Sequence, residues 1–312
     1  MTEIRQLRYF VTVAQEGQMT RAAAKLHLAQ PALSQAVSQL EARLGVELFE
    51  RHARGVSLTP AGEAYLTKAS VVLAALADAE LTAQAAARAA SRAIEWGFIG
   101  SPPMVEAPQL FGAFTASCPD ASVSFRELSF PRASTAAWLA QVDVALSYSP
   151  TPHPDVDMQP LRDEARVALV GSGHPLARRR ELAVADLLDE TFCGTDPALE
   201  PARAGFWRLD DHRGRPAPNV SNDRTSNPQE VIAVVASGRA ITVAPASNAR
   251  NVLNGLPGAG VVAVPLRDAN PTVLSLVWRR DNRNPLLGQL VAAARTIAEG
   301  PEPARDASSS LA

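Results

Sequence analysis

The hydrophobic pattern of the chain changes character once, near residue 93. Before that point apolar residues recur with helical spacing, and after it short β-prone segments alternate with helical ones. A chain of 312 residues is long enough to build more than one core, so the change predicts separate domains. We expect an N-terminal helical domain, a long helix and an α/β domain.

The first 60 residues are typical of three short helices followed by a β-hairpin. The first helix ends at Gly17, and an Ala-rich helix follows over 21–28. The third begins at Pro31, where a missing N–H costs nothing, and ends at Gly45. Its inward face is predicted to carry Leu33, Val37, Leu40 and Leu44. Residues 47–59 favour a small hairpin.

The opposite face of the third helix is polar but uncharged. It carries Pro31, Ser34, Gln35 and Ser38. Amides and hydroxyls can bond to base edges in the major groove of DNA, whereas charged groups bind phosphate anywhere. Taken by itself, the stripe is better explained by an ordinary amphipathic helix with a neutral outer face. The larger order of helix, short helix, turn, helix and basic hairpin favours a winged helix-turn-helix.

Local charge supports the same interpretation. Residues 1–62 carry seven Lys and Arg against five acidic residues, a net +2, while the whole chain has a formal net charge of −2. Arg51 and Arg54 lie on the expected hairpin, where guanidinium groups can hold phosphates.

A long Ala-rich helix is predicted after Thr59-Pro60. Apolar residues follow an alternating 4-3 spacing along it: Tyr65, Ala69, Val72, Leu76, Ala79, Ala83 and Ala86. Such a seam suits a close contact between helices of two chains. The alternative is a helix packed on its own domain. We favour the contact between chains, because the preceding residues form too small a domain to bury the whole seam.

From residue 93 the pattern predicts two series of strands and helices. Strands are expected over 93–100, 122–128, 141–148, 165–171, 240–246, 260–266 and 272–278, and helices over 105–117, 134–140, 184–190, 228–238 and 285–299. This alternation favours parallel sheets covered by helices. A Pro-rich segment over 149–160 precedes the second series. We expect two subdomains with a cleft between them, and crossings near 161–165 and 265–272.

Catalytic signals are missing from the pattern. The five His are scattered, Cys118 and Cys193 form no CxxC, and no nucleophile elbow, Walker loop or HExxH helix occurs. We expect no enzyme activity, no metal and no cofactor. The N-terminus lacks a signal-peptide pattern and no run approaches the roughly 18 apolar residues of a membrane span. A cytoplasmic protein without a membrane partner is expected, with a disordered tail over 301–312.

The stretch "LRYFVTVAQEGQMTRAAAKLHLAQPALSQAVSQLEARLGVELFERHARGVSLTPAG" resembles the N-terminal domain of LysR-type transcriptional regulators. The resemblance implies an α+β multidomain chain: a winged helix-turn-helix over 1–60, a linker and dimerisation helix over 61–90, and an effector-binding domain of periplasmic-binding-protein type over 91–300. Subdomain I would comprise 91–162 and 268–300, and subdomain II 163–267. Double-stranded DNA, a small-molecule effector and a second copy are the implied partners, with a tetramer through the sensory domains.

Carried over from the family, the DNA contacts fall on Gln30, Pro31, Ser34, Gln35, Ser38, Arg51 and Arg54. Many relatives place Arg where Gln35 and Ser38 stand here, so the hold on phosphate is expected to be weaker. A second departure is the absence of a Gly before Asp143 in the third strand of the α/β domain.

Effector contacts are expected where strands end and helices begin. The candidates are Ser101, Pro102, Ser129, Phe130, Thr195, Asp196, Thr225, Ser226 and Pro245, and the resemblance itself points to Ser101, Thr195 and Thr225. Each is equally explained as a cap or turn residue. Two other classes stay open from sequence: a solute-binding protein, and an enzyme fused to a DNA-binding module.

Overall fold

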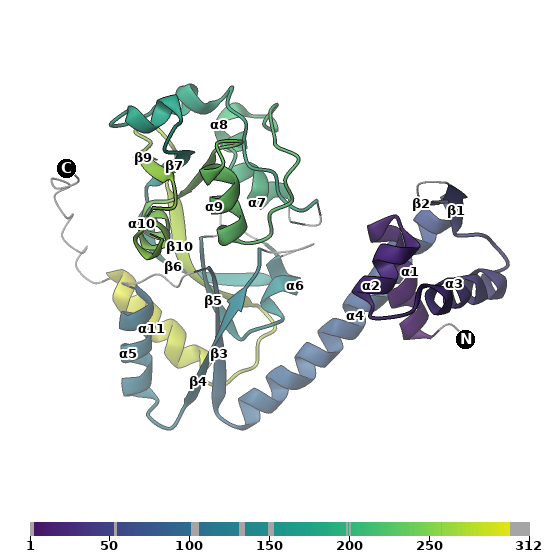
Figure 1. The fold of residues 1–312 in the computed structure, drawn as a ribbon. Helices are drawn as coiled ribbons and strands as arrows, with labels where there is room; N and C mark the ends of the chain where they lie inside the picture. The colour runs from purple at the N-terminus through teal and green to yellow at the C-terminus, as the bar shows by residue number, and fades with distance from the viewer. Residues whose placement is uncertain are drawn as a thin grey trace. The chain divides into compact units, whose positions relative to one another are not determined.

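The computed structural model describes residues 3–52, 55–100, 106–130, 135–148, 153–197, 199, 201–256 and 258–299 (Figure 1). The chain divides into two compact units, Met1–Ala83 and Gln84–Ala312, each described by itself below. The tail that was expected to be disordered lies outside the described residues.

The described part of the N-terminal unit is a winged helix-turn-helix, as predicted. Its elements are α1 (Ile4–Glu16), α2 (Met19–Lys25), α3 (Gln30–Leu44), β1 (Phe49–His52), β2 (Gly55–Leu58) and the start of α4 (Pro60–Ala90). β1 and β2 pair antiparallel, with Arg51 opposite Val56. The helices end where the sequence indicates, because Gly17 and Gly45 adopt left-handed backbone with φ of 64° and 71°.

Aromatic packing joins these elements into one core. Phe10 is fully buried, and its ring centroid lies 5.2 Å from that of Phe49 and 5.1 Å from that of Tyr65. α4 therefore begins as part of the N-terminal core. Gly62 permits this approach, since a Cβ there would lie 2.1 Å from the Leu48 carbonyl oxygen.

Most of α4 is exposed. Its first turns pack on the N-terminal core through Tyr65 and the buried Ala69, so for those residues the alternative of packing on the helix's own domain is correct. Further along, Val71 and Val72 are exposed. An 18-residue window of α4 has mean hydropathy 1.2 and is 6% buried, which by length and composition alone would suffice to cross a membrane. The expectation that no run approaches such a span is therefore wrong for α4.

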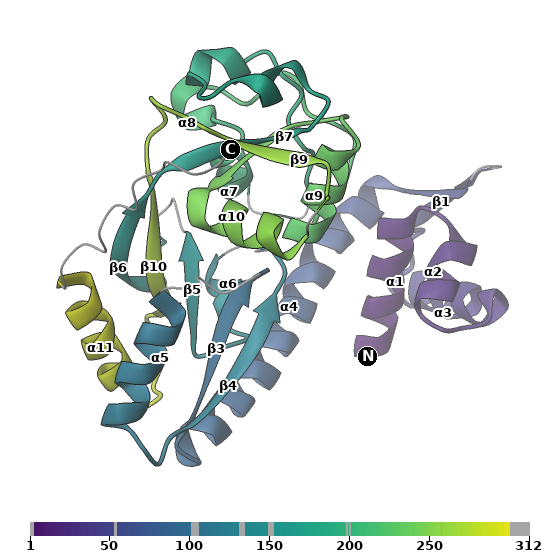
Figure 2. The same ribbon diagram turned by 60° about the vertical axis from the view of Figure 1, so that its left-hand side comes forward.

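The α/β unit contains a larger mixed sheet. Its strands are β3 (Ala93–Ile99), β4 (Ser122–Leu128), β5 (Val144–Tyr148), β6 (Val156–Glu164) and β10 (Thr272–Arg279), in the order β4-β3-β5-β10-β6. α5 (Glu106–Ser117) and α11 (Leu287–Glu299) lie side by side on one face (Figure 2). α6 (Thr135–Leu139) packs on the other face through Trp138.

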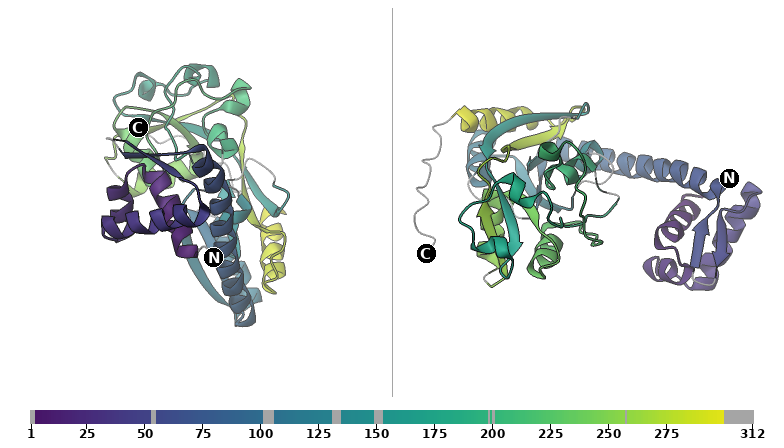
Figure 3. Two further views of the ribbon diagram at one scale, coloured as in Figure 1. Left: turned by 90° about the vertical axis from the view of Figure 1, so that its right-hand side faces the viewer. Right: turned by 90° about the horizontal axis from the view of Figure 1, so that it is seen from above.

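The smaller sheet has the order β8-β7-β9 and is antiparallel. Its strands are β7 (Arg166–Gly171), β8 (Thr242–Pro245) and β9 (Val261–Pro265). Around it lie two 3₁₀ turns (Pro175–Arg178 and Val184–Leu187), α7 (Pro201–Phe206), α8 (Asp210–Arg213), α9 (Pro228–Ala236) and α10 (Ala246–Gly255) (Figure 3). The chain passes between the two sheets twice, at Ala165 and between Pro265 and Thr272.

Two expectations about these sheets are corrected. Parallel sheets were predicted, but among the named strands of the described residues the parallel pairs are β3 with β4 and β3 with β5, and the other parallel pairings are isolated bridges. β10 runs antiparallel to β5 and β6, because it returns from the smaller sheet and not through a βαβ crossover. β6 was missed within the Pro-rich segment, and its Pro160 is tolerated because β6 is an edge strand.

A buried ion network attaches the end of α4 to the larger sheet. Asp143 is 3% exposed, and its Oδ2 accepts from the Arg88 Nε at 2.9 Å and from the Glu95 backbone N–H at 2.8 Å. Glu95 in turn pairs with Arg126 at 2.8 Å. Asp143, noted for its unusual preceding sequence, is therefore an anchor of the fold.

Candidate DNA-reading helix and effector cavity

α3 separates an apolar face from a polar one. Leu33, Val37 and Leu40 are buried, whereas Leu44, which was predicted to face inward, is 37% exposed because it lies in the last turn before Gly45. Gln30, Pro31, Gln35 and Ser38 are exposed, and Ser34 is half-buried. The exposed face carries hydrogen-bonding groups without charge.

The hairpin places one basic residue against this helix. The exposed Arg51 donates from Nη2 to Ser34 Oγ at 3.3 Å, so a guanidinium lies at the edge of the polar face of α3. Arg54 lies outside the described residues. Two other basic residues of the unit, Arg21 and Lys25, pair with Glu16 at 3.0 and 2.8 Å. The bond from Lys25 holds the pKa of Glu16 below its usual value.

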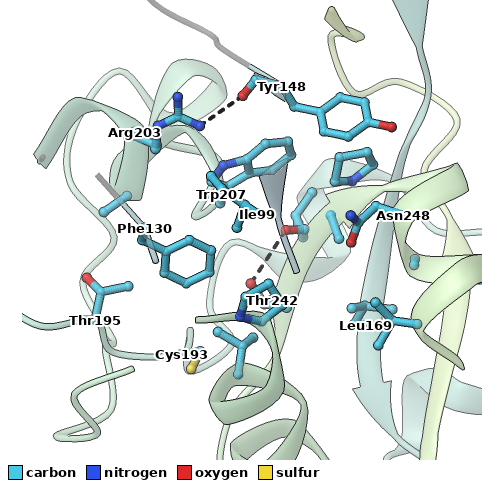
Figure 4. Close-up of a pocket in the computed structure, with 18 of the residues that line it drawn as sticks. Ile99, Phe130, Tyr148, Leu169, Cys193, Thr195, Arg203, Trp207, Thr242 and Asn248 are labelled. Carbon is cyan, nitrogen blue, oxygen red and sulfur yellow. Dashed lines mark hydrogen bonds between the residues drawn. The ribbon is translucent and has the colours of Figure 1, made fainter. Parts of the chain in front are cut away.

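The α/β unit holds a cavity of about 150 Å³ between its two sheets (Figure 4). Residues from β5 of the larger sheet and β7 and β8 of the smaller one line it, together with α7, α9 and α10. Three of the predicted effector residues, Phe130, Thr195 and Pro245, are among the lining residues. The cavity wall is mainly apolar.

The other predicted effector residues that the structure describes, Ser129, Asp196, Thr225 and Ser226, are not among the lining residues. Ser101 and Pro102 lie outside the described residues. Ser129 is exposed and offers its carbonyl to Trp138 Nε1 at 2.8 Å. The backbone N–H of Asp196 donates to the Thr225 carbonyl at 3.0 Å, which joins two segments behind the wall.

Thr225 has a structural role that local sequence could not show. It is 2% exposed, and its hydroxyl donates to the Gly194 carbonyl at 2.8 Å. The hydroxyl is therefore used within the fold. Thr225 is not among the described residues that line the cavity.

The start of α9 is already capped by side chains of its own segment. The side chain of Asn227 caps the helix by accepting from the Glu230 backbone N–H at 2.9 Å. The carboxylate of Glu230 accepts from the Ser226 backbone N–H and hydroxyl, at 2.6 and 3.0 Å. The backbone bond from Ser226 lowers the pKa of Glu230. A second anion at this helix start would be repelled by that carboxylate.

The wall contains residues that sequence reasoning missed. They are Arg203 in α7, Trp207 and Arg208 just after it, Tyr148 at the end of β5 and Asn248 in α10. Figure 4 shows Phe130, Trp207 and Tyr148 bordering the same space. The only signal was the cluster of aromatic and Arg residues in "RAGFWRLDDHR", which has no clear helical or strand periodicity.

Hydrogen bonds cross between the two subdomains around the cavity. Arg203 Nη1 donates to the Tyr148 carbonyl at 3.1 Å (Figure 4), and the Phe130 N–H donates to the Ser226 carbonyl at 2.9 Å. The Tyr148 hydroxyl lies 2.8 Å from Ser247 Oγ and 3.1 Å from Glu164 Oε2. Burial raises the pKa of Tyr148, so its hydroxyl stays neutral.

Cys193 contributes a neutral thiol to the wall. Burial raises its pKa, and its Sγ lies 3.8 Å from Thr225 Oγ1. In the part of the chain that the structure describes, no group of three or more His, Cys, Asp and Glu is arranged to hold a metal ion.

Comparison with known proteins identifies the family. Residues 4–63 match the profile described as bacterial regulatory helix-turn-helix protein, lysR family, and residues 89–298 match the LysR substrate binding domain. The Hca operon transcriptional activator HcaR of Escherichia coli K12 is 31% identical over 291 residues, covering 93% of this chain and 96% of that protein. The regulator AlsR of Bacillus subtilis 168 is 28% identical over 294 residues, covering 93% and 94%.

A solved structure leads to the same assignment. The crystal structure of CbnR, described as a LysR family transcriptional regulator, has a TM-score of 0.51 and 25% identity, and the match covers 96% of this chain and 100% of that one. This chain belongs to the LysR family of bacterial transcriptional regulators. It is a DNA-binding regulator with a helix-turn-helix domain and an effector-binding domain.

Proposed function

We propose that this regulator reads its operator with the polar face of α3. Gln30, Gln35 and Ser38 are exposed on a helix whose other face is anchored in the core, so they are held in a fixed orientation. Amide and hydroxyl groups can both donate to and accept from base edges in the major groove. Arg51, at the edge of this face, binds phosphate, and Arg54 is assigned the same role from the family resemblance.

The regulator works as a dimer through α4. Among the described residues, the seam positions beyond Ala69 do not belong to the N-terminal core, and exposed Val72 begins an apolar stretch that a second copy would cover. Two copies of α3 then bind two half-sites. By resemblance to the family, pairing of the α/β units extends the dimer to a tetramer.

A small molecule bound in the cavity shifts the regulator between states. The two subdomains are joined by two chain crossings and by direct bonds around the cavity, so a ligand that contacts both walls favours the closed form by its differential affinity. The protein acts in the cytoplasm, where it reaches DNA, and it neither catalyses a reaction nor needs a cofactor.

The observation that carries this function is an uncharged exposed face on a core-anchored α3, flanked by Arg51. The test is selection of binding sites from random duplex DNA with the full chain, followed by titration of the selected site at several salt concentrations. We expect enrichment of a two-part site that is bound at least 10³-fold more tightly than random DNA, on the order of known specific regulators. Equal binding to selected and random DNA would overturn the proposal.

A further inference from the structure

The charged groups on the cavity wall are unbalanced. Two lining residues carry guanidinium groups, Arg203 and Arg208, and no Asp or Glu is among the described residues that line the cavity. A cation in a mainly apolar wall costs free energy unless hydrogen bonds or an anion compensate it. Arg203 and Arg208 differ in how far hydrogen bonds within the fold compensate their charge.

Arg203 already has partners within the fold. It is 8% exposed, and it donates to the Tyr148 carbonyl at 3.1 Å and to Ser147 Oγ at 3.3 Å. These bonds join α7 to β5 across the two subdomains. Arg203 therefore shapes the cavity as a positioning residue.

Arg208 has no carboxylate partner within 4.0 Å among the described residues. Its Nη2 donates to Thr195 Oγ1 at 2.7 Å, while its Nε is buried without an acceptor. Burial lowers the pKa of Arg208, and the charge of Asp210 acts in the opposite direction. The nearest acidic residue in the sequence, Asp210, pairs with Arg213 at 3.1 Å.

Thr195 adds a donor next to this guanidinium. Its oxygen accepts from Arg208, so the hydroxyl proton remains available for a second partner. Arg208 and Thr195 both line the cavity and are bonded to each other, so an N–H and an O–H donor lie side by side in its wall. A planar carboxylate accepts from such a pair of donors.

The rest of the cavity wall limits the size and the polarity of the uncharged part of the ligand. Phe130 and Trp207 supply aromatic surface, and Leu169, Val231 and Ile232 supply aliphatic surface. The cavity volume of about 150 Å³ is comparable with that of an apolar cavity that binds benzene. One guanidinium and one hydroxyl are too few donors for a phosphate dianion, which favours a singly charged group.

We infer that the effector is a monocarboxylate whose apolar body is about the size of one aromatic ring, with its carboxylate bound by Arg208 and Thr195. This inference rests on the proposed function of the cavity as the effector site. Binding of such a monocarboxylate places an anion beside Arg208 and fills the apolar space between the two subdomains.

The test compares carboxylates with their uncharged amides on the full chain. Benzoate and hexanoate are titrated against benzamide and hexanamide by calorimetry and by the thermal unfolding midpoint, with inorganic phosphate as an anion that lacks an apolar body. We expect each carboxylate to bind at least tenfold more tightly than its amide, and phosphate to bind more weakly than either carboxylate. Arg208→Gln should reduce the preference for carboxylate to less than threefold, and Thr195→Val should reduce it in part.

Arg215→Gln is the matched control, because Arg215 is exposed and does not line the cavity. It should keep the full preference. Amides that bind as tightly as carboxylates to the unmodified chain would overturn the role of Arg208, and this comparison needs no variant to fold. Failure of both carboxylates to bind, with operator selection intact, would overturn the ligand class alone. Loss of operator selection in the unmodified chain would instead overturn the proposed function.

Discussion

Arg203 of α7 donates to the backbone carbonyl of Tyr148 in β5 at 3.1 Å, and so bonds one subdomain to the other beside the cavity. The same guanidinium reaches Ser147 Oγ. Because both acceptors belong to one strand, the planar Arg group can bind them together while a single ammonium cannot.

Arg203→Lys should therefore loosen the two subdomains. Loss of a hydrogen bond from a charged group costs about 1.5–3 kcal/mol, and a unit of this size loses about 2–4 °C of its unfolding midpoint per kcal/mol. Differential scanning calorimetry of the full chain measures the change. Arg239→Lys, at an exposed surface pair with Asp223, is the control and should shift the midpoint little. An unchanged midpoint for Arg203→Lys would show that the bond adds no stability.

Gln35→Ala tests base reading. The side chain is exposed on α3, so its removal should leave the fold intact and weaken the selected site by roughly 1–3 kcal/mol, while binding to random DNA stays nearly the same. Fluorescence anisotropy with the selected and a scrambled duplex makes the comparison. Equal losses on both duplexes would contradict base reading by Gln35.

Arg51→Ala tests the phosphate contact. Binding should weaken on every sequence alike, and the slope of log affinity against log salt should fall by about one, because one fewer counterion is released. Gln39, which is exposed on α3 but lies outside the predicted set, offers a control as Gln39→Ala. A loss confined to the selected duplex would mean that Arg51 reads bases.

Leu76→Glu tests the seam of α4. A carboxylate at this position would oppose its own copy across the helix contact, so the dimer should dissociate. Ala74→Glu adds the same charge at an exposed position on the opposite side of the helix, and should leave the dimer unchanged. Light scattering measures the molar mass, and so the oligomeric state, of each variant. A dimer that persists in Leu76→Glu would rule out this seam as the main interface.

Thr225→Val separates a structural residue from a ligand contact. The buried hydroxyl donates to Gly194, so its loss should lower stability by about 1 kcal/mol. The ratio of carboxylate to amide affinity should stay as in the unmodified chain, unlike the ratio for Thr195→Val. Calorimetry gives both quantities. A carboxylate preference that falls in Thr225→Val would return this residue to the site.

Local sequence determined the N-terminal domain well. The spacing of Leu33, Val37 and Leu40 and the helix ends at Gly17 and Gly45 depend on neighbours within one or two turns, and all appear in the structure. Leu44 was assigned to the core by the same spacing and is partly exposed, because its burial depends on what lies beyond the helix end. Most strands of the α/β unit were also located, since alternating burial is a local signal.

Only the tertiary structure decided the direction of the strands and the wall of the cavity. β10 pairs antiparallel with β5 because the chain reaches it from the smaller sheet, whose first strand begins about a hundred residues before β10. Strand ends pointed to Phe130 and Pro245 and a loop pointed to Thr195, and all three line the cavity, but the orientation of Thr225 depends on the distant Gly194. Whether Arg208 has an anion beside it depends on where Asp210 points, which is settled by packing between segments and not by the order of residues.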